Sequence, residues 1–488
     1  EESLFKFFFM ALFAGLAALL TPCVFPMIPM TVAFFTGNEK GRADAIREAI
    51  IFGISIIAIY TIVGIGVSVL FGAEVANDLA TSAIANIIFF IIFFIFALSF
   101  LGAFDIILPS SFVNKMNKNA DKGGLIGVFF MAFTLVLVSF SCTGPIVGSV
   151  LIESAQGEIL KPIIGMLGFS LAFAVPFTIF AIFPEWMQSL PKSGGWLNSV
   201  KVVLGFLELA LAIKFLSIAD QTYHWGILDR EIYLAFWIVI FSLMGVYLLG
   251  KLQLPHDTPV KNLSVTRLLL SIVTFTFVVY MIPGMFGAPL KALSGYLPPM
   301  TTQDFDLNRI IRQSQEPSNY SNLSDNDFPL NPRFSSFLHL PHGINGFFDY
   351  DEAVEFAREM NMPLFIDFTG HGCVNCRKME EYVWADKRVL SRLVNEYVVL
   401  ALYVDDKTVL PEEEWYISNY DGKVKKTIGK QNFDFQIGTF NSNAQPYYVL
   451  LGNDEKILTN PQSYDLNIDR FIEFLDTGKR NFEGNDND

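Results

Sequence analysis

The sequence predicts a helical membrane domain followed by a small α/β domain, and three observations support this fold class. Of the 488 residues, 52% are hydrophobic and 17% are charged, and the mean hydropathy is +0.42. The apolar residues gather in long runs, whereas the C-terminal part of the chain is polar and acidic. This combination is typical of a membrane protein that carries a soluble part.

Eight apolar runs set the predicted number of membrane spans, because each is close to the ~20 residues that a helix needs to cross a bilayer. The runs are Leu4–Phe35, Ile50–Phe71, Ile84–Leu108, Leu125–Leu151, Pro162–Phe183, Val200–Leu216, Ile232–Leu249 and Leu268–Met281. The first run also admits a cleaved signal peptide, since Leu20-Thr21-Pro22-Cys23 resembles a lipoprotein cleavage site. The run continues well past Cys23, however, which favours a span that is broken in its middle.

Basic residues between the runs predict the orientation in the membrane. They concentrate in alternate connections, those after the first, third, fifth and seventh runs: Lys40, Arg42, Arg47; Lys115, Lys118, Lys122; Lys192, Lys201; Lys251, Lys261, Arg267. By the positive-inside rule these loops face the cytoplasm. Both ends of the chain, and with them the soluble domain, are therefore expected outside the cytoplasm in an oxidising compartment.

The soluble part carries almost all of the net charge. From Tyr296 to the end there are 31 acidic and 18 basic residues, a net charge of −13 out of −14 for the whole chain. Such an acidic domain argues against nucleic acid or an anionic membrane surface as its partner.

Composition also predicts the domain boundaries. We expect a transmembrane domain over 1–295, a linker rich in Pro, Ser, Asn and Asp over 296–342, and an independent α/β domain over 343–488. In the last domain we expect strands at Leu364–Phe368, Val398–Val404 and Tyr447–Leu451, and helices at Asp351–Met360, Lys387–Glu396 and Ile468–Leu475.

The soluble domain contains a C-x-x-C motif, Cys373-Val374-Asn375-Cys376, between an expected buried strand and an expected helix. The partial positive charge of a helix N-terminus stabilises a thiolate, which is the species that attacks disulfides. With two residues between them, Cys376 can reach Cys373 and resolve a mixed disulfide. A zinc site is the alternative, but it would need a second ligand pair, and His371 is the one nearby histidine. We therefore predict redox chemistry, with Cys373 attacking and Cys376 resolving.

The other two cysteines, Cys23 and Cys142, lie in apolar runs next to prolines. Pro22, Pro26 and Pro29 interrupt the first run, and Pro145 with Gly144 interrupts the fourth. Proline breaks a helix, and irregular backbone inside a membrane is tolerated where it is buried in protein or lines a water-accessible cavity. Each cysteine taken singly is a common packing residue. Matching breaks in corresponding spans instead predict that Cys23 and Cys142 form a reversible disulfide, and that the first six spans form two inverted three-helix units.

Three further residues are expected near the C-x-x-C motif. Asp367 lies on the strand before it, where burial would raise the pKa of the carboxyl group and allow proton exchange with Cys376. Glu380, one turn after Cys376, either acts in the same way or is solvated. Pro446 precedes a strand and is a candidate cis-proline. In the sixth span, Glu208 is either functional or structurally paired.

On these residues the chain resembles the thiol:disulfide interchange protein DsbD family, and its membrane part is similar to the shorter cytochrome c biogenesis protein CcdA. The motifs that carry the resemblance are Thr21–Pro29, Phe140–Pro145, Gly287–Gly295 and Asp-Phe-Thr-Gly before Gly-Cys-Val-Asn-Cys.

The resemblance implies a protein-disulfide reductase of the bacterial inner membrane whose C-terminal domain is thioredoxin-like and periplasmic. Electrons would pass from cytoplasmic thioredoxin to Cys23 and Cys142, then to Cys373 and Cys376, and finally to periplasmic proteins. It also places the family's acidic residues at Asp367 and Glu380 and its cis-proline at Pro446. No bound metal, haem, flavin or other cofactor is expected, and membrane lipid surrounds the spans.

The chain departs from the family in two ways. His371-Gly372 replaces the Trp that thioredoxins place before the first cysteine, and the family's N-terminal immunoglobulin-like redox domain is absent from this chain. Either that domain was removed, or separate partners, including such a domain on another protein, accept the electrons. The alternative functions are a dedicated reductant supply for cytochrome c maturation and, in a different class, a small-molecule transporter with a tethered thioredoxin-like regulator.

Overall fold

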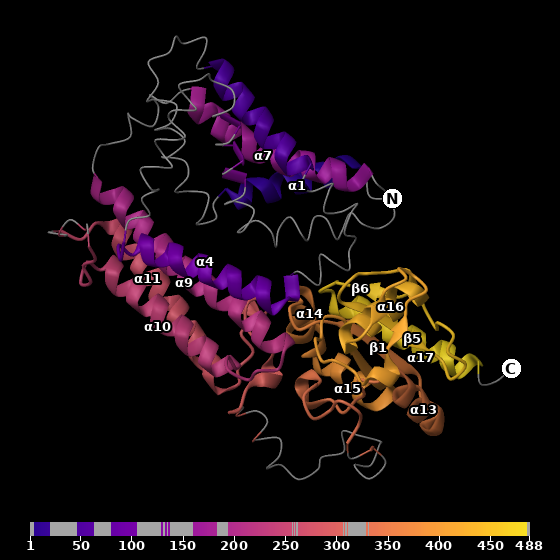
Figure 1. Ribbon diagram of the computed structural model, residues 1–488. Helices are drawn as coiled ribbons and strands as arrows, with labels where there is room; N and C mark the ends of the chain where they lie inside the picture. The colour runs from indigo at the N-terminus through magenta and orange to yellow at the C-terminus, as the bar shows by residue number, and fades with distance from the viewer. Residues whose placement is uncertain are drawn as a thin grey trace. The chain divides into compact units, whose positions relative to one another are not determined.

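A computed structural model gives the structure of the chain (Figure 1). It describes residues 4–19, 46–62, 80–104, 160–182, 194–255, 262–305 and 331–485, together with single positions between these ranges. The chain forms two compact units. The first comprises residues 1–80, 91–212 and 250–263, and the second comprises residues 81–90, 213–249 and 264–488.

The first unit contains apolar helices that approach one another closely. Helix α1 (Leu4–Ala18) packs along α7 (Leu160–Ile182). A Cβ atom at Gly15 would lie 2.7 Å from the carbonyl oxygen of Phe169, so glycine is required for this approach. Buried aromatic side chains, among them Tyr60, Phe169 and Phe173, form the core around it.

The second unit contains a pair of apolar helices, α10 (Arg230–Leu248) and α11 (Val265–Met281), which lie side by side (Figure 1). The hydroxyl of Ser271 donates a hydrogen bond to the carbonyl oxygen of Gly245 at 3.1 Å. A Cβ atom at Gly245 would lie 2.8 Å from the ring of Phe275. Small residues at such contacts allow helices to pack closely within a membrane.

Among the described residues, four helices are long and apolar enough to cross a membrane. These stretches are Ala83–Phe100, Asn198–Thr222, Arg230–Leu248 and Val265–Phe286. They correspond to α4 (Ala83–Phe100), to most of α9 (Gly194–Thr222), to α10, and to α11 with the short turn η1 (Ile282–Phe286). They coincide with four of the eight predicted runs. Each of the other four runs is described only in part or contains a shorter apolar helix, so the predicted number of spans is not tested.

The second unit also contains the α/β domain, whose four-stranded sheet has the order β2-β1-β5-β6. Strand β1 (Leu364–Thr369) is parallel to β2 (Val398–Tyr403) and antiparallel to β5 (Tyr447–Leu451), which pairs with β6 (Gln462–Ser463). Every residue of β1 is buried, as expected for a central strand covered on both faces.

Helices surround this sheet, and local capping residues fix where several begin. They are α13 (Tyr350–Met360), α14 (Val374–Met379), a π-helical turn η5 (Glu380–Trp384), α15 (Lys387–Glu396), α16 (Ile428–Phe440) and α17 (Ile468–Asn485). Asp349 and Asp386 accept hydrogen bonds from the first turns of α13 and α15. The predicted strands and helices of this domain are confirmed to within a few residues, except that α17 is longer than expected.

Several elements of the α/β domain were not predicted, among them the short strand β6 (Gln462–Ser463). Helix α16 carries Gly429 and Gly438, which weaken the helical pattern in the sequence, and a small hairpin joins β3 (Tyr416–Ile417) to β4 (Val424–Lys425). The predicted linker over 296–342 also differs from the structure at its C-terminal end. Leu338 and Leu340 are buried in the core with Phe365 and Trp384, because these apolar side chains cover the sheet before α13 begins. The packed domain therefore starts before residue 343.

Candidate functional site: a dithiol motif at a strand-to-helix junction

Cys373 and Cys376 lie where the chain passes from β1 into α14, and they are joined by a disulfide with their Cα atoms 5.3 Å apart. Cys373 caps the helix, and its sulfur accepts a hydrogen bond from the backbone N–H of Cys376 at 3.1 Å. Cys376 is 1% exposed, whereas Cys373 is half-buried. An outside disulfide can therefore reach Cys373 more readily than Cys376, as the predicted roles of attacking and resolving thiol require.

Asp367 lies on β1, buried between the two neighbouring strands. Burial raises the pKa of its carboxyl group well above the usual value, and the charge of Glu380 adds to this, while Arg377 acts in the opposite direction. Its Oδ1 atom accepts no hydrogen bond from the described residues. A buried carboxyl group in this condition holds a proton more tightly than an exposed one, which is the property expected of a proton-exchanging group.

Glu380 is also buried, which excludes the alternative that it is merely solvated. Its Oε1 atom forms an ion pair with Arg377 Nη2 at 2.7 Å. Burial raises the pKa of Glu380 to about 7 although Arg377 acts to lower it. Asp367 and Glu380 are thus two buried acids that differ in their partners, since Glu380 is ion-paired and Asp367 forms no ion pair within the described part of the chain.

The Gln445–Pro446 peptide bond is cis, as the sequence suggested. The register of the sheet pairs Phe368 of β1 with Tyr447 of β5. Pro446, directly before Tyr447, therefore lies near the C-terminal end of β1, where the C-x-x-C loop leaves this strand.

The remaining predicted site residues divide into two groups. Cys23, Cys142, Pro22, Pro26 and Pro145 lie outside the described residues. Glu208 lies buried within α9.

The structure adds contacts to the C-x-x-C helix that the sequence did not reveal. Arg230, at the start of α10, is fully buried and pairs with Glu381 at 3.3 Å. Gly295 approaches Val374 so closely that a Cβ atom there would lie 2.5 Å from Val374 Cγ1. Gly295 is the last residue of Gly287–Gly295, one of the motifs on which the resemblance to the DsbD family rests. This motif therefore contacts the helix that carries the thiols. The distance in sequence between the partners explains why no local pattern predicted these contacts.

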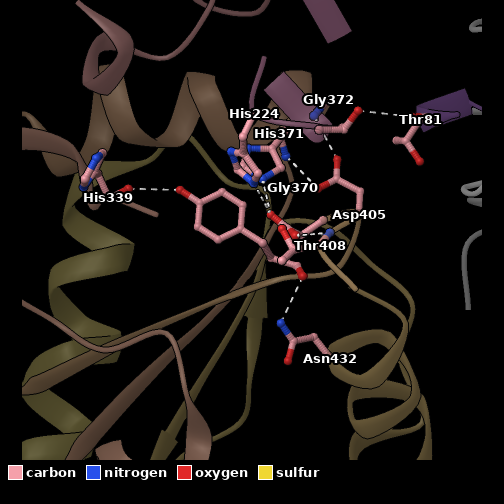
Figure 2. A network of polar contacts seen from close by, with 12 residues as sticks. Thr81, His224, His339, Gly370, His371, Gly372, Asp405, Thr408 and Asn432 are labelled. Atoms are coloured by element: carbon pink, nitrogen blue, oxygen red, sulfur yellow. Dashed lines mark hydrogen bonds and ion pairs between the residues drawn. The ribbon is translucent and has the colours of Figure 1, made fainter. Parts of the chain in front are cut away.

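A second cluster lies beside the motif and was also missed. His371, two residues before Cys373, and His224, after the end of α9, lie side by side (Figure 2). Both contact Asp406. The sequence separation of 182 residues between His224 and Asp406 left no detectable ligand pattern.

Comparison with known proteins matches both parts of the chain. Residues 4–219 match a family described as the cytochrome c biogenesis protein transmembrane domain, and residues 345–425 match a thioredoxin-like family. The chain is 25% identical over 398 residues to the thiol:disulfide interchange protein DsbD of Pseudoalteromonas atlantica, which covers 79% of this chain and 57% of that protein. It is 26% identical over 400 residues to DsbD of Vibrio vulnificus, with coverage of 80% and 57%.

Shorter matches are closer in sequence. DsbD of Actinobacillus pleuropneumoniae is 33% identical over 226 residues, which is 44% of this chain and 36% of that protein. The chain spans 57% of the length of the curated relatives that it matches most extensively.

The order of the two matched parts, a multi-pass membrane domain and then a thioredoxin-like domain with a C-x-x-C motif, is common to the sequence, the structure and these comparisons. On this basis, the chain is homologous to DsbD proteins in both its membrane part and its thioredoxin-like part.

Proposed function

We propose that this chain is a protein-disulfide reductase that carries reducing equivalents across a bacterial inner membrane by successive thiol–disulfide exchange. The donor is a cytoplasmic thioredoxin, and the acceptors are periplasmic disulfide-containing proteins or a separate immunoglobulin-like redox domain. The observation that carries the proposal is the arrangement at α14, where half-buried Cys373 caps the helix in front of buried Cys376. The relatives named thiol:disulfide interchange protein support the same activity.

In the outer exchange, the Cys373 thiolate attacks the acceptor disulfide and forms a mixed disulfide, which releases one acceptor thiolate. The Cys376 thiol then loses its proton and attacks Cys373, so that the second acceptor sulfur leaves and the Cys373–Cys376 disulfide forms. Two electrons and two protons reach the acceptor. Asp367 and Glu380, whose pKa values are raised by burial, supply groups that can take the proton from Cys376.

The membrane pair Cys23 and Cys142 then reduces the Cys373–Cys376 disulfide and is itself reduced by the cytoplasmic thioredoxin. This requires eight spans with both chain ends outside the cytoplasm, and two inverted three-helix units whose broken helices at Pro22, Pro26 and Pro145 expose the pair. The distribution of basic residues in the loops supports this topology.

The test is the redox state of the C-x-x-C motif in cells, read by a thiol reagent that adds mass to each free cysteine. In the Cys142→Ala variant, Cys373 and Cys376 should accumulate as the disulfide, whereas the neighbouring Ser141→Ala control should keep them reduced. If they stay reduced in Cys142→Ala, the relay through the membrane pair is wrong.

The second candidate function is the reduction of a narrower range of acceptor proteins. The membrane domain matches a family described by cytochrome c biogenesis, which favours apocytochromes c, directly or through a carrier, as acceptors. Covalent trapping on the Cys376→Ala variant followed by identification of the bound proteins decides between broad and dedicated reduction. A broad reductase captures many unrelated proteins, and a dedicated one captures only the cytochrome c assembly proteins.

A further inference from the structure

Three side chains from distant parts of the sequence converge next to the C-x-x-C motif. Nε2 of His224 lies 2.7 Å from Oδ2 of Asp406, and Nε2 of His371 lies 3.0 Å from the same oxygen. His224 follows α9, His371 precedes α14 and Asp406 follows β2. All three residues belong to the same compact unit.

The geometry of these atoms suits a bound cation. One ring nitrogen of each histidine and a carboxylate oxygen of Asp406 all lie within 4.8 Å of one another, and the imidazole rings are nearly perpendicular, at 83°. Bonds of about 2.0–2.1 Å in a tetrahedral site place ligand atoms about 3.3 Å apart. The present nitrogen–oxygen distances need to open by only a few tenths of an ångström to reach this spacing.

The carboxylate is held in place before any ligand binds. The Asp406 side chain is fully buried, and its other oxygen, Oδ1, accepts a hydrogen bond from the backbone N–H of Thr408 at 2.8 Å. Oδ2 therefore remains directed at the histidines. A hydrogen bond that orients a ligating carboxylate in this way is a regular feature of metal sites.

His371 is equally restrained. Its ring stacks on Tyr403, with 4.4 Å between the ring centroids. Its backbone N–H donates to Asp405 Oδ1 at 2.8 Å, and the next N–H, of Gly372, donates to Oδ2 of the same residue at 2.9 Å. The loop that carries His371 is therefore already ordered, so that little conformational entropy would be lost when a cation binds.

Asp406 carries the charge that a cation site needs. Its side chain is fully buried, and the groups that face its Oδ2 atom are the Nε2 atoms of His224 and His371. A metal ion requires a deprotonated carboxylate and neutral imidazole nitrogens, so it would replace the two hydrogen bonds and keep the buried charge neutralised.

An adjoining pocket gives access to this cluster. It has a volume of about 420 Å³ and is lined by three of the chain's five histidines, His224, His339 and His371. Three aspartates, Asp220, Asp229 and Asp304, line it as well. An acidic entrance attracts cations, and its open space leaves room for a water molecule as a further ligand.

We propose that His224, His371 and Asp406 bind a divalent transition-metal cation of the Zn²⁺ class, with water in the fourth position. Two imidazole nitrogens and one carboxylate oxygen are a donor set that Zn²⁺ favours over Ca²⁺ or Mg²⁺. The ion would tie the loop before Cys373 to the end of α9. The site does not depend on the proposed electron relay, because none of its ligands is a redox cysteine.

The test measures metal binding directly on the full chain in detergent. Cys23 and Cys142 are replaced by Ser and the Cys373–Cys376 disulfide is kept oxidised, so that no thiolate competes for the ion. After removal of metals with a chelator, Zn²⁺ is added by equilibrium dialysis and counted by elemental analysis. Co²⁺ serves as a spectroscopic probe, since four-coordinate Co²⁺ has characteristic visible absorption bands.

We expect one Zn²⁺ per chain, and at least about tenfold weaker binding in each of His224→Gln, His371→Gln and Asp406→Asn. His256→Gln, which changes a histidine that is not one of the three proposed ligands, should bind as the parent does. Formation of the Cys373–Cys376 disulfide in every variant shows that the domain has folded. The proposal is overturned if the parent binds less than one ion, or if His224→Gln and His371→Gln bind as tightly as His256→Gln; the cluster is then a hydrogen-bonded contact without metal.

Discussion

Two buried aspartates near the C-x-x-C motif behave in opposite ways. Asp367 on β1 and Asp406 after β2 are 3% and 1% exposed. The pKa of Asp367 is raised well above its usual value, whereas that of Asp406 is lowered. Burial acts in the same direction on both. The difference comes from their neighbours, because Asp406 accepts hydrogen bonds from two histidines and Asp367 Oδ1 accepts none from the described residues.

The two carboxyl groups are therefore expected to have different roles in the same domain. A carboxyl group whose pKa is raised can exchange a proton during thiol chemistry, whereas a carboxylate that stays ionised can hold a contact or a cation. The comparison therefore predicts that changes at the first kind of acid alter pH dependence and rate, and that changes at the second kind alter stability or binding.

The largest expected effect is on the pH dependence of stability, through Glu380. Its pKa rises from 4.5 to about 7 on folding, so the folded state retains a proton that the unfolded state has released. Its stabilising contribution is complete below pH 4.5 and is lost as the pH rises through about 7, a change of roughly 3 kcal/mol. Glu380→Gln should remove this part of the slope.

The free energy of unfolding of the α/β domain is measured in the full chain at pH values between 4.5 and 8, with susceptibility to a protease as the readout. Its dependence on pH gives this slope. Glu355→Gln, on an exposed position of α13, is the control and should leave it unchanged. An unchanged slope in Glu380→Gln would mean that Glu380 does not titrate in this range.

The next effect is on the rate of resolution by Cys376. Asp367→Asn removes a proton acceptor from the site and should slow release of the acceptor from the mixed disulfide by about 10²-fold near pH 7. Asp406→Asn should change this rate by less than threefold, because Asp406 is not expected to take the proton. Single-turnover reduction of a peptide disulfide, quenched with acid and then alkylated, resolves the step. Equal slowing in both variants would contradict the division of roles.

Asp406→Asn should instead lower stability. Removing the negative charge weakens two hydrogen bonds from histidines, each of which is charge-assisted at one end, and should cost about 1–3 kcal/mol in the free energy of unfolding. Thermal unfolding of the metal-free full chain measures the loss. Glu359→Gln, at an exposed position of α13 in the same domain, is the control for a charge change away from the histidines. If the two variants lose the same stability, the histidine contacts contribute nothing specific.

The smallest effect concerns Gly295, which contacts the C-x-x-C helix without carrying charge. Gly295→Ala places a methyl group 2.5 Å from Val374 Cγ1 and should slow reduction of the Cys373–Cys376 disulfide by the membrane domain several-fold. Gly438→Ala adds a methyl group where no atom lies within 4 Å and should leave the rate unchanged. Alkylation time courses on membranes supplied with a thioredoxin compare the two. Identical rates would show that this close contact does not affect the exchange.

Much of the fold was predictable because its signals are local. The continuous apolar run of β1, the C-x-x-C spacing and the proline before β5 each identify an element or a conformation by nearby residues. Helix α16 was missed because its glycines obscure the helical pattern, and the burial of Leu338 was missed because a polar neighbourhood resembled a linker. At the site, Asp367 and Glu380 could be selected from their distance to the thiols in sequence.

The contacts that α9 and α10 make with the α/β domain could not be selected in this way. Arg230 reaches Glu381 from 151 residues away, and His224 reaches Asp406 from 182 residues away. Such contacts depend on how α9 and α10 end beside the α/β domain within the second unit, which no spacing in the sequence records. The lowered pKa of Asp406 depends in part on the long-range contact with His224, whereas the raised pKa of Asp367 comes mainly from burial on β1, so only the pKa shift of Asp367 was predictable from the sequence.

The most direct test of the proposed relay is a measurement of electron transfer across a sealed membrane. The full chain is placed in lipid vesicles with a thioredoxin, its reductase and NADPH confined to the side of the basic loops, and the thiols of Cys373 and Cys376 are counted on the other side by a reagent that does not cross lipid. The account predicts that both thiols appear in the parent chain and that neither appears in Cys23→Ala or Cys142→Ala. Appearance of the thiols at the parental rate in either variant would contradict it.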